Sequence, residues 1–315
     1  MYRYIARRLL VTVLLAWGVV TIASVIIHFA PGDVVQALLQ EGAPSQELIQ
    51  LRRHALGLDR PYLVQYLEWL GGLTHLNMGM SLANERPIGP DIARSLPRTL
   101  ELICAGLLLG TLVGIPAGIL AAGQRARFAD WSVTLGALTG LSVPVYVKAT
   151  LLLLCFGLFL KWLPTAGYIA FRDDPLGHLR YLFLPALTLG IGVAALTARF
   201  TRATMLEVMN QEYIRTARAK GLGQRAIQYH HALKNAVIPV ITVIGIESGT
   251  LLGGTIIVEY VFSWPGMSTL MMQGIDRRDY PMVQAVFLII GILFLLINLL
   301  TDLINASVDP RVRYQ

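Results

Sequence analysis

Residues 212–239 read EYIRTARAKGLGQRAIQYHHALKNAVIP, and this basic, helix-forming stretch lies between two long apolar runs. Charged side chains are costly inside a bilayer, so the stretch belongs outside the lipid. A plain connection between two membrane spans needs neither this charge nor this helix-forming composition. A membrane protein that keeps a structured basic loop on one side usually presents it to a partner.

The composition of the whole chain indicates a membrane-integral protein. Of its 315 residues, 55% are hydrophobic and only 14% are charged, whereas a soluble globular protein carries about 25% charged residues. The formal net charge of +7 could indicate nucleic-acid binding. Because the basic residues lie between apolar runs, orientation in a membrane explains them, and we expect membrane lipid but no nucleic acid as a partner.

Six stretches are long and apolar enough to cross a bilayer, which takes about 20 residues per helix. They cover residues 9–30, 100–122, 131–160, 181–198, 236–258 and 283–306. The third is too long for one straight span, so either Pro144 kinks it or its outer end runs past the bilayer. The predicted fold is all-α and integral to the membrane, with six transmembrane helices.

The basic residues also orient these spans. Arg3, Arg7 and Arg8 precede the first apolar run, which we interpret as an uncleaved anchor. The positive-inside rule then places both termini in the cytoplasm. The segments assigned to the cytoplasmic side hold 14 Lys and Arg residues, and the outer segments, which include 31–97 and the turn at 277–278, hold 10.

Segment 31–97 is too long for a bare turn, and its residues 62–73 have the pattern of an amphipathic helix. We predict a small extracytoplasmic subdomain there. The chain then divides into an N-terminal anchor with the first span (1–30), this subdomain (31–97) and a five-helix core (98–315). The core contains a cytoplasmic segment, residues 199–235, which we call the basic loop.

Within the basic loop, apolar spacing predicts one amphipathic helix over 205–220. Gly221 stands where a C-cap glycine belongs, and a second short helix follows, with residues 226, 229, 233 and 237 on one face and Pro239 at the entry to the next span. Small residues allow close docking in a groove of another protein, and basic residues allow pairing with acids around it. The small residues are Thr216, Ala217 and Ala219, and the basic ones are Arg215, Arg218 and Lys220. The alternative is a solvated loop that only enforces topology, but topology needs neither small residues nor a cap.

Two features inside the spans allow more than one interpretation. Glycines recur every four residues at 106–118 and at 245–253, which favours close packing within the chain over a sliding contact in a moving bundle. Ionisable residues in spans are functional candidates. Glu247 either lines the translocation pathway or is held by neighbouring helices, and Lys148 more plausibly snorkels to the outer interface than contacts substrate.

Familiar catalytic chemistry is missing from the sequence. It contains no GxxxxGK[ST] phosphate loop and neither HExxH nor GxSxG. The adjacent His230 and His231 diverge by about 100° on a helix and make a poor metal pair, and Cys104 and Cys155 look like small core residues. We predict no enzyme activity, no metal site and no cofactor bound by this chain.

The residues quoted so far resemble a known family. YIRTARAKG at 213–221 with HALKNAVIP at 231–239 is similar to the cytoplasmic EAA loop of ABC importer permeases, in the variant of the peptide and nickel importers. Further matching stretches, in the same order, are HFAPGD at 28–33, LGLDRP at 56–61 with QY at 65–66, FSWPG at 262–266, RDYP at 278–281 and DPR at 309–311. Two departures from the general motif suit that branch: Arg215-Thr216 stands for Glu-Ala, and the proline comes later.

The resemblance implies a type I ABC importer permease in a bacterial inner membrane. It would pair with a second homologous permease, two ATPase subunits that bind the ATP and Mg²⁺, and an extracytoplasmic substrate-binding protein. The ATPase-coupling residues would be 215–221, that is Arg215, Thr216, Ala217, Arg218, Ala219, Lys220 and Gly221. The substrate would be a di- or oligopeptide, with a nickel or other metal chelate or glutathione as alternatives. Different classes are an ion-coupled secondary transporter or channel, which usually shows internal repeats, and a purely structural subunit.

Overall fold

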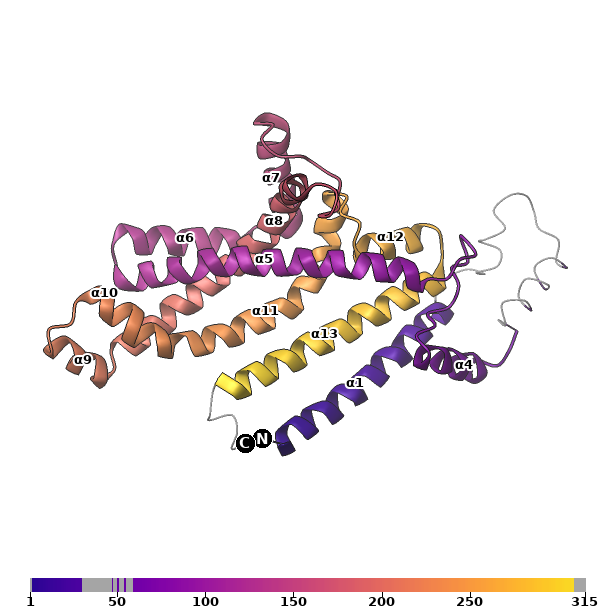
Figure 1. The fold of residues 1–315 in the computed structure, drawn as a ribbon, viewed down its shortest axis with the longest axis horizontal. Coiled ribbons are helices and arrows are strands. Elements are labelled where there is room, and N and C mark those ends of the chain that lie inside the picture. The colour runs from indigo at the N-terminus through magenta and orange to yellow at the C-terminus, as the bar shows by residue number, and fades with distance from the viewer. Residues whose placement is uncertain (1, 30–46, 48–49, 51–53, 55–58, 309–315) are drawn as a thin grey trace. The chain divides into compact units, whose positions relative to one another are not determined.

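The computed structural model describes residues 2–29, 47, 50, 54 and 59–308, and helices dominate them (Figure 1). The first part of the predicted subdomain, the motif at 309–311 and parts of those at 28–33 and 56–61 lie outside the described residues. The helices are α1 (Tyr2–Phe29), α4 (Tyr62–Thr74), α5 (Gly89–Gly123), α6 (Phe128–Ser142), α7 (Val145–Leu152), η1 (Leu153–Phe159), α8 (Pro175–Met209), α9 (Glu212–Ala219), α10 (Gln224–Ala226), η2 (Ile227–Ala232), α11 (Leu233–Val261), α12 (Met267–Asp276) and α13 (Tyr280–Val308).

The spans agree with the six expected from the sequence. Within the described residues, five stretches of helix are long and apolar enough to cross a membrane, and the pair formed by α6 and α7–η1 makes six when it is counted as one span. The break lies at Pro144 and bends the two halves by 107°. Proline has no N–H and clashes with the preceding turn, so the kink interpretation of the long third run is confirmed.

The described chain forms two compact units. The first comprises Met1–Ile5, Leu100–Trp264 and Ile297–Gln315, and the second comprises Ala6–Thr99 and Pro265–Leu296. The three-part division made from the sequence remains a prediction.

Helix α8 is the centre of the first unit. In the apolar 18-residue stretch of α8, the buried share is 61%, whereas the corresponding stretches of the other unbroken spans have buried shares of 17% to 39%. The glycine stripe of α5 faces it: a Cβ at Gly110 would lie 2.5 Å from the Cβ of Val193, and one at Gly118 would lie 2.6 Å from that of Thr201. Packing within the chain is therefore confirmed for this stripe. In the α11 stripe Gly245 packs closely on Thr301, but a Cβ at Gly253 would meet no described atom within 4 Å.

In the second unit, α4 confirms a helix near 62–73 and packs on α1, but it is not amphipathic as expected, because Leu63 and Leu67 are apolar and exposed. The hydroxyl of Tyr66 hydrogen-bonds Thr21 Oγ1 at 3.1 Å, and that of Tyr62 hydrogen-bonds Ser24 Oγ at 2.5 Å. The turn between α12 and α13 is held through buried Asp279, whose carboxylate accepts from Ser81 Oγ and from the backbone N–H of Leu82. The RDYP motif thus joins the segment before α5 to the start of α13.

Candidate functional site

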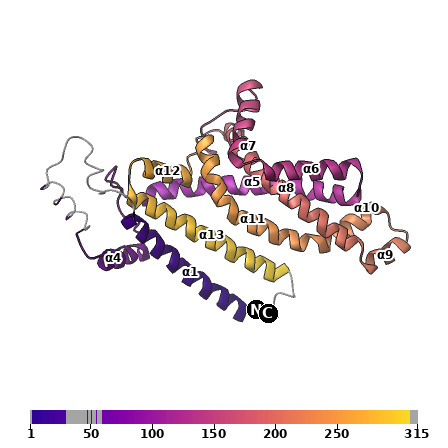
Figure 2. The ribbon, with the colours of Figure 1, turned by 180° about the vertical axis from the view of Figure 1, so that it is seen from behind.

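Within the basic loop, α9 and α10 lie between the end of α8 and the start of α11, and Figures 1 and 2 both show them side by side. The single helix predicted over 205–220 is wrong. Helix α8 ends at Met209, and the chain turns through Asn210 and an extended Gln211 (ψ 151°) before α9 begins. The Arg218 guanidinium reaches back to the Met209 carbonyl, one of the carbonyls left without a helical partner, at 3.5 Å.

The inner face of α9 is fixed to the rest of the chain by an apolar cluster. Ile214 is fully buried and Ala217 is 7% exposed. Their cluster partners come from α5, α8, η2 and the start of α11, and include Ile119, Met205 and Ala232. The expectation that Ala217 offers a docking surface to a partner is therefore wrong, because its small size instead lets α9 lie close against its own chain.

Gly221 ends α9 as the sequence predicts. Its φ of +78° lies in the left-handed region that glycine adopts without a steric penalty. Its N–H donates to the carbonyl of Arg218 at 2.9 Å, and the next N–H, that of Leu222, donates to the carbonyl of Ala217 at 3.4 Å. This pair of bonds is the Schellman motif, which satisfies the last carbonyls of a helix.

The outer face of α9 is exposed and basic. The exposed residues of this face are Arg215, Thr216, Arg218 and Ala219, and the cap residues Lys220 and Gly221 are exposed as well. Arg215 forms an ion pair of 2.7 Å with Glu212, but both side chains are more than two-thirds exposed, so water and salt leave that pair weak. Six of the seven predicted coupling residues therefore lie on an accessible surface.

The second short helix predicted in the loop is not a separate element. From Gln224 the chain runs through the π-helical segment η2 directly into α11. A π turn adds one residue and so rotates the buried face. For this reason Ile227, Ala232 and Ala236 are buried, while Tyr229 is 52% exposed. Pro239, expected at the entry to the span, lies inside α11.

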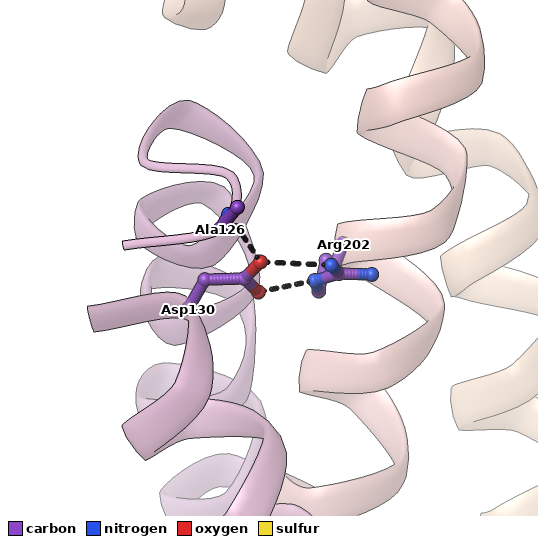
Figure 3. Close-up of polar contacts among 3 residues, drawn as sticks. All are labelled: Ala126, Asp130 and Arg202. Carbon is purple, nitrogen blue, oxygen red and sulfur yellow. Dashed lines mark hydrogen bonds and ion pairs between the residues drawn. The ribbon is translucent and has the colours of Figure 1, made fainter. Parts of the chain in front are cut away.

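A charge pair that the sequence reasoning missed holds the neighbouring turn (Figure 3). Asp130, which is buried, accepts from Arg202 Nε at 2.5 Å and from Arg202 Nη2 at 2.9 Å, and also from the Ala126 N–H at 3.0 Å. Ala126 has a φ of +61°, which costs a non-glycine residue energy. The carboxylate thereby fixes the α5–α6 turn to α8, seven residues before the end of α8. The sequence contained two signals for this pair: an acid in the first turn of one apolar segment, Asp130, and an arginine near the end of another, Arg202.

Lys148, a predicted pathway residue, has a definite structural partner. Its Nζ donates to the carbonyl of Gly140 at 3.0 Å, across the 107° bend. In an unbroken helix that carbonyl would accept from the N–H of residue 144, but Pro144 has none. The ammonium supplies the missing donor and lies at the carbonyl end of α6, where the helix dipole favours a cation.

Glu247, the other pathway candidate, lies partly buried on α11. Its carboxylate accepts from Thr250 Oγ1 at 3.3 Å, one turn further along the same helix. No hydrogen bond or ion pair joins these two described residues, Glu247 and Lys148. The arrangement leaves both interpretations of Glu247 as predictions.

Sequence comparison relates the whole chain to membrane transport proteins. Residues 114–314 match the family described as the binding-protein-dependent transport system inner membrane component, and residues 1–103 match its N-terminal counterpart. A putative peptide permease protein of Brucella suis biovar 1 is 41% identical over 318 residues, covering 99% of each chain. The glutathione transport system permease protein GsiC of Escherichia coli K12 is 37% identical over 315 residues, covering both chains entirely.

Solved structures with the same fold are also transport proteins. An inward-facing MetNI methionine ABC transporter chain superposes with a TM-score of 0.57 at 19% identity, covering 70% of this chain and 96% of that one. A chain from an amino acid ABC transporter with histidines gives a TM-score of 0.53 at 16% identity, covering 69% and 94%. At these identities the likeness concerns the fold.

Proposed function

This chain belongs to the family of inner membrane components of binding-protein-dependent transport systems, and from that membership we propose that it forms half of the pathway through which a bacterial ABC importer takes up short peptides. The membership itself makes it a permease subunit of an ABC importer. The second half of the pathway would come from a homologous permease. ATP binding and hydrolysis would belong to two partner ATPase subunits.

The relatives support peptides as the substrate class. One relative is named a putative peptide permease and another a glutathione permease. Glutathione is itself a tripeptide, so both names describe small peptide-like cargo. A di- or oligopeptide is our first candidate for the substrate. Glutathione is the second candidate, because the glutathione permease matches this chain over its full length.

The outer face of α9 is the proposed contact with an ATPase subunit, and this geometry carries the coupling part of the proposal. The outer face is basic and exposed. The inner face of α9 packs on α5, α8, η2 and the start of α11, and Gly221 fixes the C-terminal end of α9. A push on α9 would therefore pass into three spans through a packed cluster rather than through a flexible loop. The Asp130–Arg202 pair would carry the α5–α6 turn with α8.

The proposed orientation follows from the basic residues. Both termini and the basic loop would lie in the cytoplasm, with the α12–α13 turn and the segment before α5 on the outer side, where the binding protein docks. This places the ATPase contact and the binding-protein contact on opposite sides of the membrane.

Reconstitution tests the proposed function directly. The complete transporter, in proteoliposomes with its binding protein, should take up a labelled tripeptide only when ATP is supplied. The same vesicles assayed with labelled glutathione separate the two substrate candidates. Uptake by this chain alone, without ATPase subunits, would contradict the proposal and favour a secondary transporter.

A further inference from the structure

A buried histidine at the start of α8 has no part in the function derived so far. His178 is 1% exposed and lies among the first four residues of α8. Its ring packs edge-on against the rings of Tyr168, Phe171 and Trp264, with centroids 5.6 to 5.8 Å apart. Because a buried polar atom without a hydrogen bond is costly, both ring nitrogens of such a histidine need partners.

Both ring nitrogens have partners, and the partners determine where the protons lie. Nδ1 of His178 is 2.6 Å from the carbonyl oxygen of Ile169. A carbonyl oxygen only accepts hydrogen bonds, so Nδ1 carries a hydrogen. Nε2 is 2.7 Å from Oε1 of Glu101, and a hydrogen bond of that length has a proton between the two atoms.

The proton between Nε2 and Oε1 belongs to the pair. With Nδ1 already protonated, the pair is either an imidazolium beside a carboxylate or a neutral imidazole beside a carboxylic acid. In both descriptions His178 and Glu101 hold one shared proton and carry no net charge together. The side chain of Glu101 is 35% exposed, so the shared proton can exchange with solvent although the histidine is buried.

Other charged or titratable groups belong to the elements around the pair. Tyr168 comes from the segment before α8, and Asp174, one turn before the histidine, accepts from two backbone N–H groups of α8. On α5, Arg98 lies one turn before Glu101 and donates to a backbone carbonyl at 3.3 Å. On α11, the backbone carbonyl of the buried Glu259 accepts from the N–H of the tryptophan that packs on the histidine. Among these described groups, Glu101 bonds a ring nitrogen directly.

The pair joins several elements at one end of the first unit. Glu101 belongs to α5, His178 to α8, and Ile169 to the segment 160–174 that connects η1 with α8. This segment is also tied to the end of α11, because the N–H of Gly167 donates to the carbonyl of Phe262 at 2.9 Å. Helices α8 and α11 connect this end to the basic loop. The pair thus lies at the far end of two helices that contact α9.

We propose that His178 and Glu101 are positioning residues, and that the proton they share holds α5, α8 and the segment 160–174 together during transport. Without this proton, the lone pair of Nε2 would face a carboxylate, and the two would repel. In an unfolded chain at about pH 8, a glutamate is ionised and a histidine is neutral, so the folded pair binds one proton more. A folded state that binds more protons loses stability as the pH rises.

The expected consequence is a transporter that weakens on the alkaline side. The statement about uptake rests on the proposed function, whereas the statement about stability does not. The complete transporter, reconstituted with its binding protein, is assayed for thermal unfolding and for ATP-driven uptake of a labelled tripeptide from about pH 7 to about pH 9.5.

Glu101→Gln is the decisive variant, because the amide N–H of glutamine donates to a neutral Nε2 and so keeps the joint without the shared proton. Over this pH range the Tm of the wild type should fall by about 2–4 °C more than that of Glu101→Gln. The ratio of variant uptake to wild-type uptake should rise with pH. His178→Phe keeps an aromatic ring but no donor, so it should lower the Tm already at about pH 7 and also lack the additional alkaline fall.

Glu68→Gln is the matched control. It makes the same change in α4, where Glu68 and its partner Arg60 are both more than half exposed, and it should follow the wild type at every pH. Equal alkaline falls in the wild type and Glu101→Gln would overturn the proposal, and so would a reduced fall in Glu68→Gln. If the wild type shows no ATP-driven uptake at any pH, the proposed function has failed, and thermal unfolding alone then decides whether the shared proton holds the joint.

Discussion

Replacing Gly221 by valine should uncouple ATP hydrolysis from transport while leaving the spans assembled. Gly221 holds a φ of +78°, and its N–H and that of Leu222 close the end of α9. A side chain with a Cβ is disfavoured in this conformation, and a branched one most of all. The valine variant should release the cap, so that the exposed face of α9 loses its fixed position.

The magnitude follows from the backbone conformation alone. A Cβ at position 221 would meet no described atom within 4 Å, so no clash adds to the cost. The left-handed conformation costs a non-glycine residue roughly 1–2 kcal/mol, and more for valine. At about 1.4 kcal/mol per factor of ten, 2 kcal/mol lowers the population of the capped form about 30-fold relative to the frayed form.

Position 223 supplies the matched control. Gly223 also has open space around its Cβ position, but its φ of −66° and ψ of 151° are extended values that valine adopts readily. Gly223→Val should therefore keep coupling, and Gly221→Asn should keep most of it because asparagine tolerates the left-handed region. The assay is binding-protein-stimulated ATPase activity and ATP-driven uptake in the same proteoliposomes. Equal coupling in Gly221→Val and Gly223→Val would refute the reasoning.

Three further predictions concern the packing that supports the site, and each is measured by thermal unfolding of the purified transporter. Gly110→Leu should destabilise it by about 1–3 kcal/mol through overpacking against α8, whereas Gly136→Leu, whose Cβ position is open, should not; equal melting temperatures would contradict the packing. Lys148→Met should cost about 1–3 kcal/mol by leaving a helix carbonyl without a donor, and Lys148→Arg should restore it; a methionine variant of full stability would disprove the role of the ammonium. Asp130→Leu should cost about 2–3 kcal/mol because Arg202 is left unpaired, and adding Arg202→Met should recover part of the loss; an additive double variant would argue against the pair.

Sequence patterns predicted those parts of the fold that depend on local chemistry. Apolar run length indicated the spans, the missing N–H of Pro144 predicted the bend, and Gly221 marked the end of α9. Each of these effects acts within a few residues along the chain, so neighbouring sequence is enough to reveal it.

The errors arose where tertiary contacts decide. Apolar spacing favoured one helix over 205–220, but the burial of Ile214 and Ala217 against α5 and α8 requires the turn at Asn210. The π turn of η2 changes the helical period, which a pattern based on 3.6 residues does not detect. The Asp130–Arg202 pair joins residues 72 positions apart, and one sequence provides no measure of such proximity.

Cysteine cross-linking from the two alanines of α9 tests the central claim most directly. Ala219 is exposed and Ala217 is 7% exposed on the opposite, packed side. We predict that Ala219→Cys forms a cross-link to an ATPase subunit, with a yield that changes between the ATP-bound and nucleotide-free transporter, and that Ala217→Cys forms none. A cross-link from Ala217→Cys but not from Ala219→Cys, or a yield from Ala219→Cys that ignores ATP, would contradict the account.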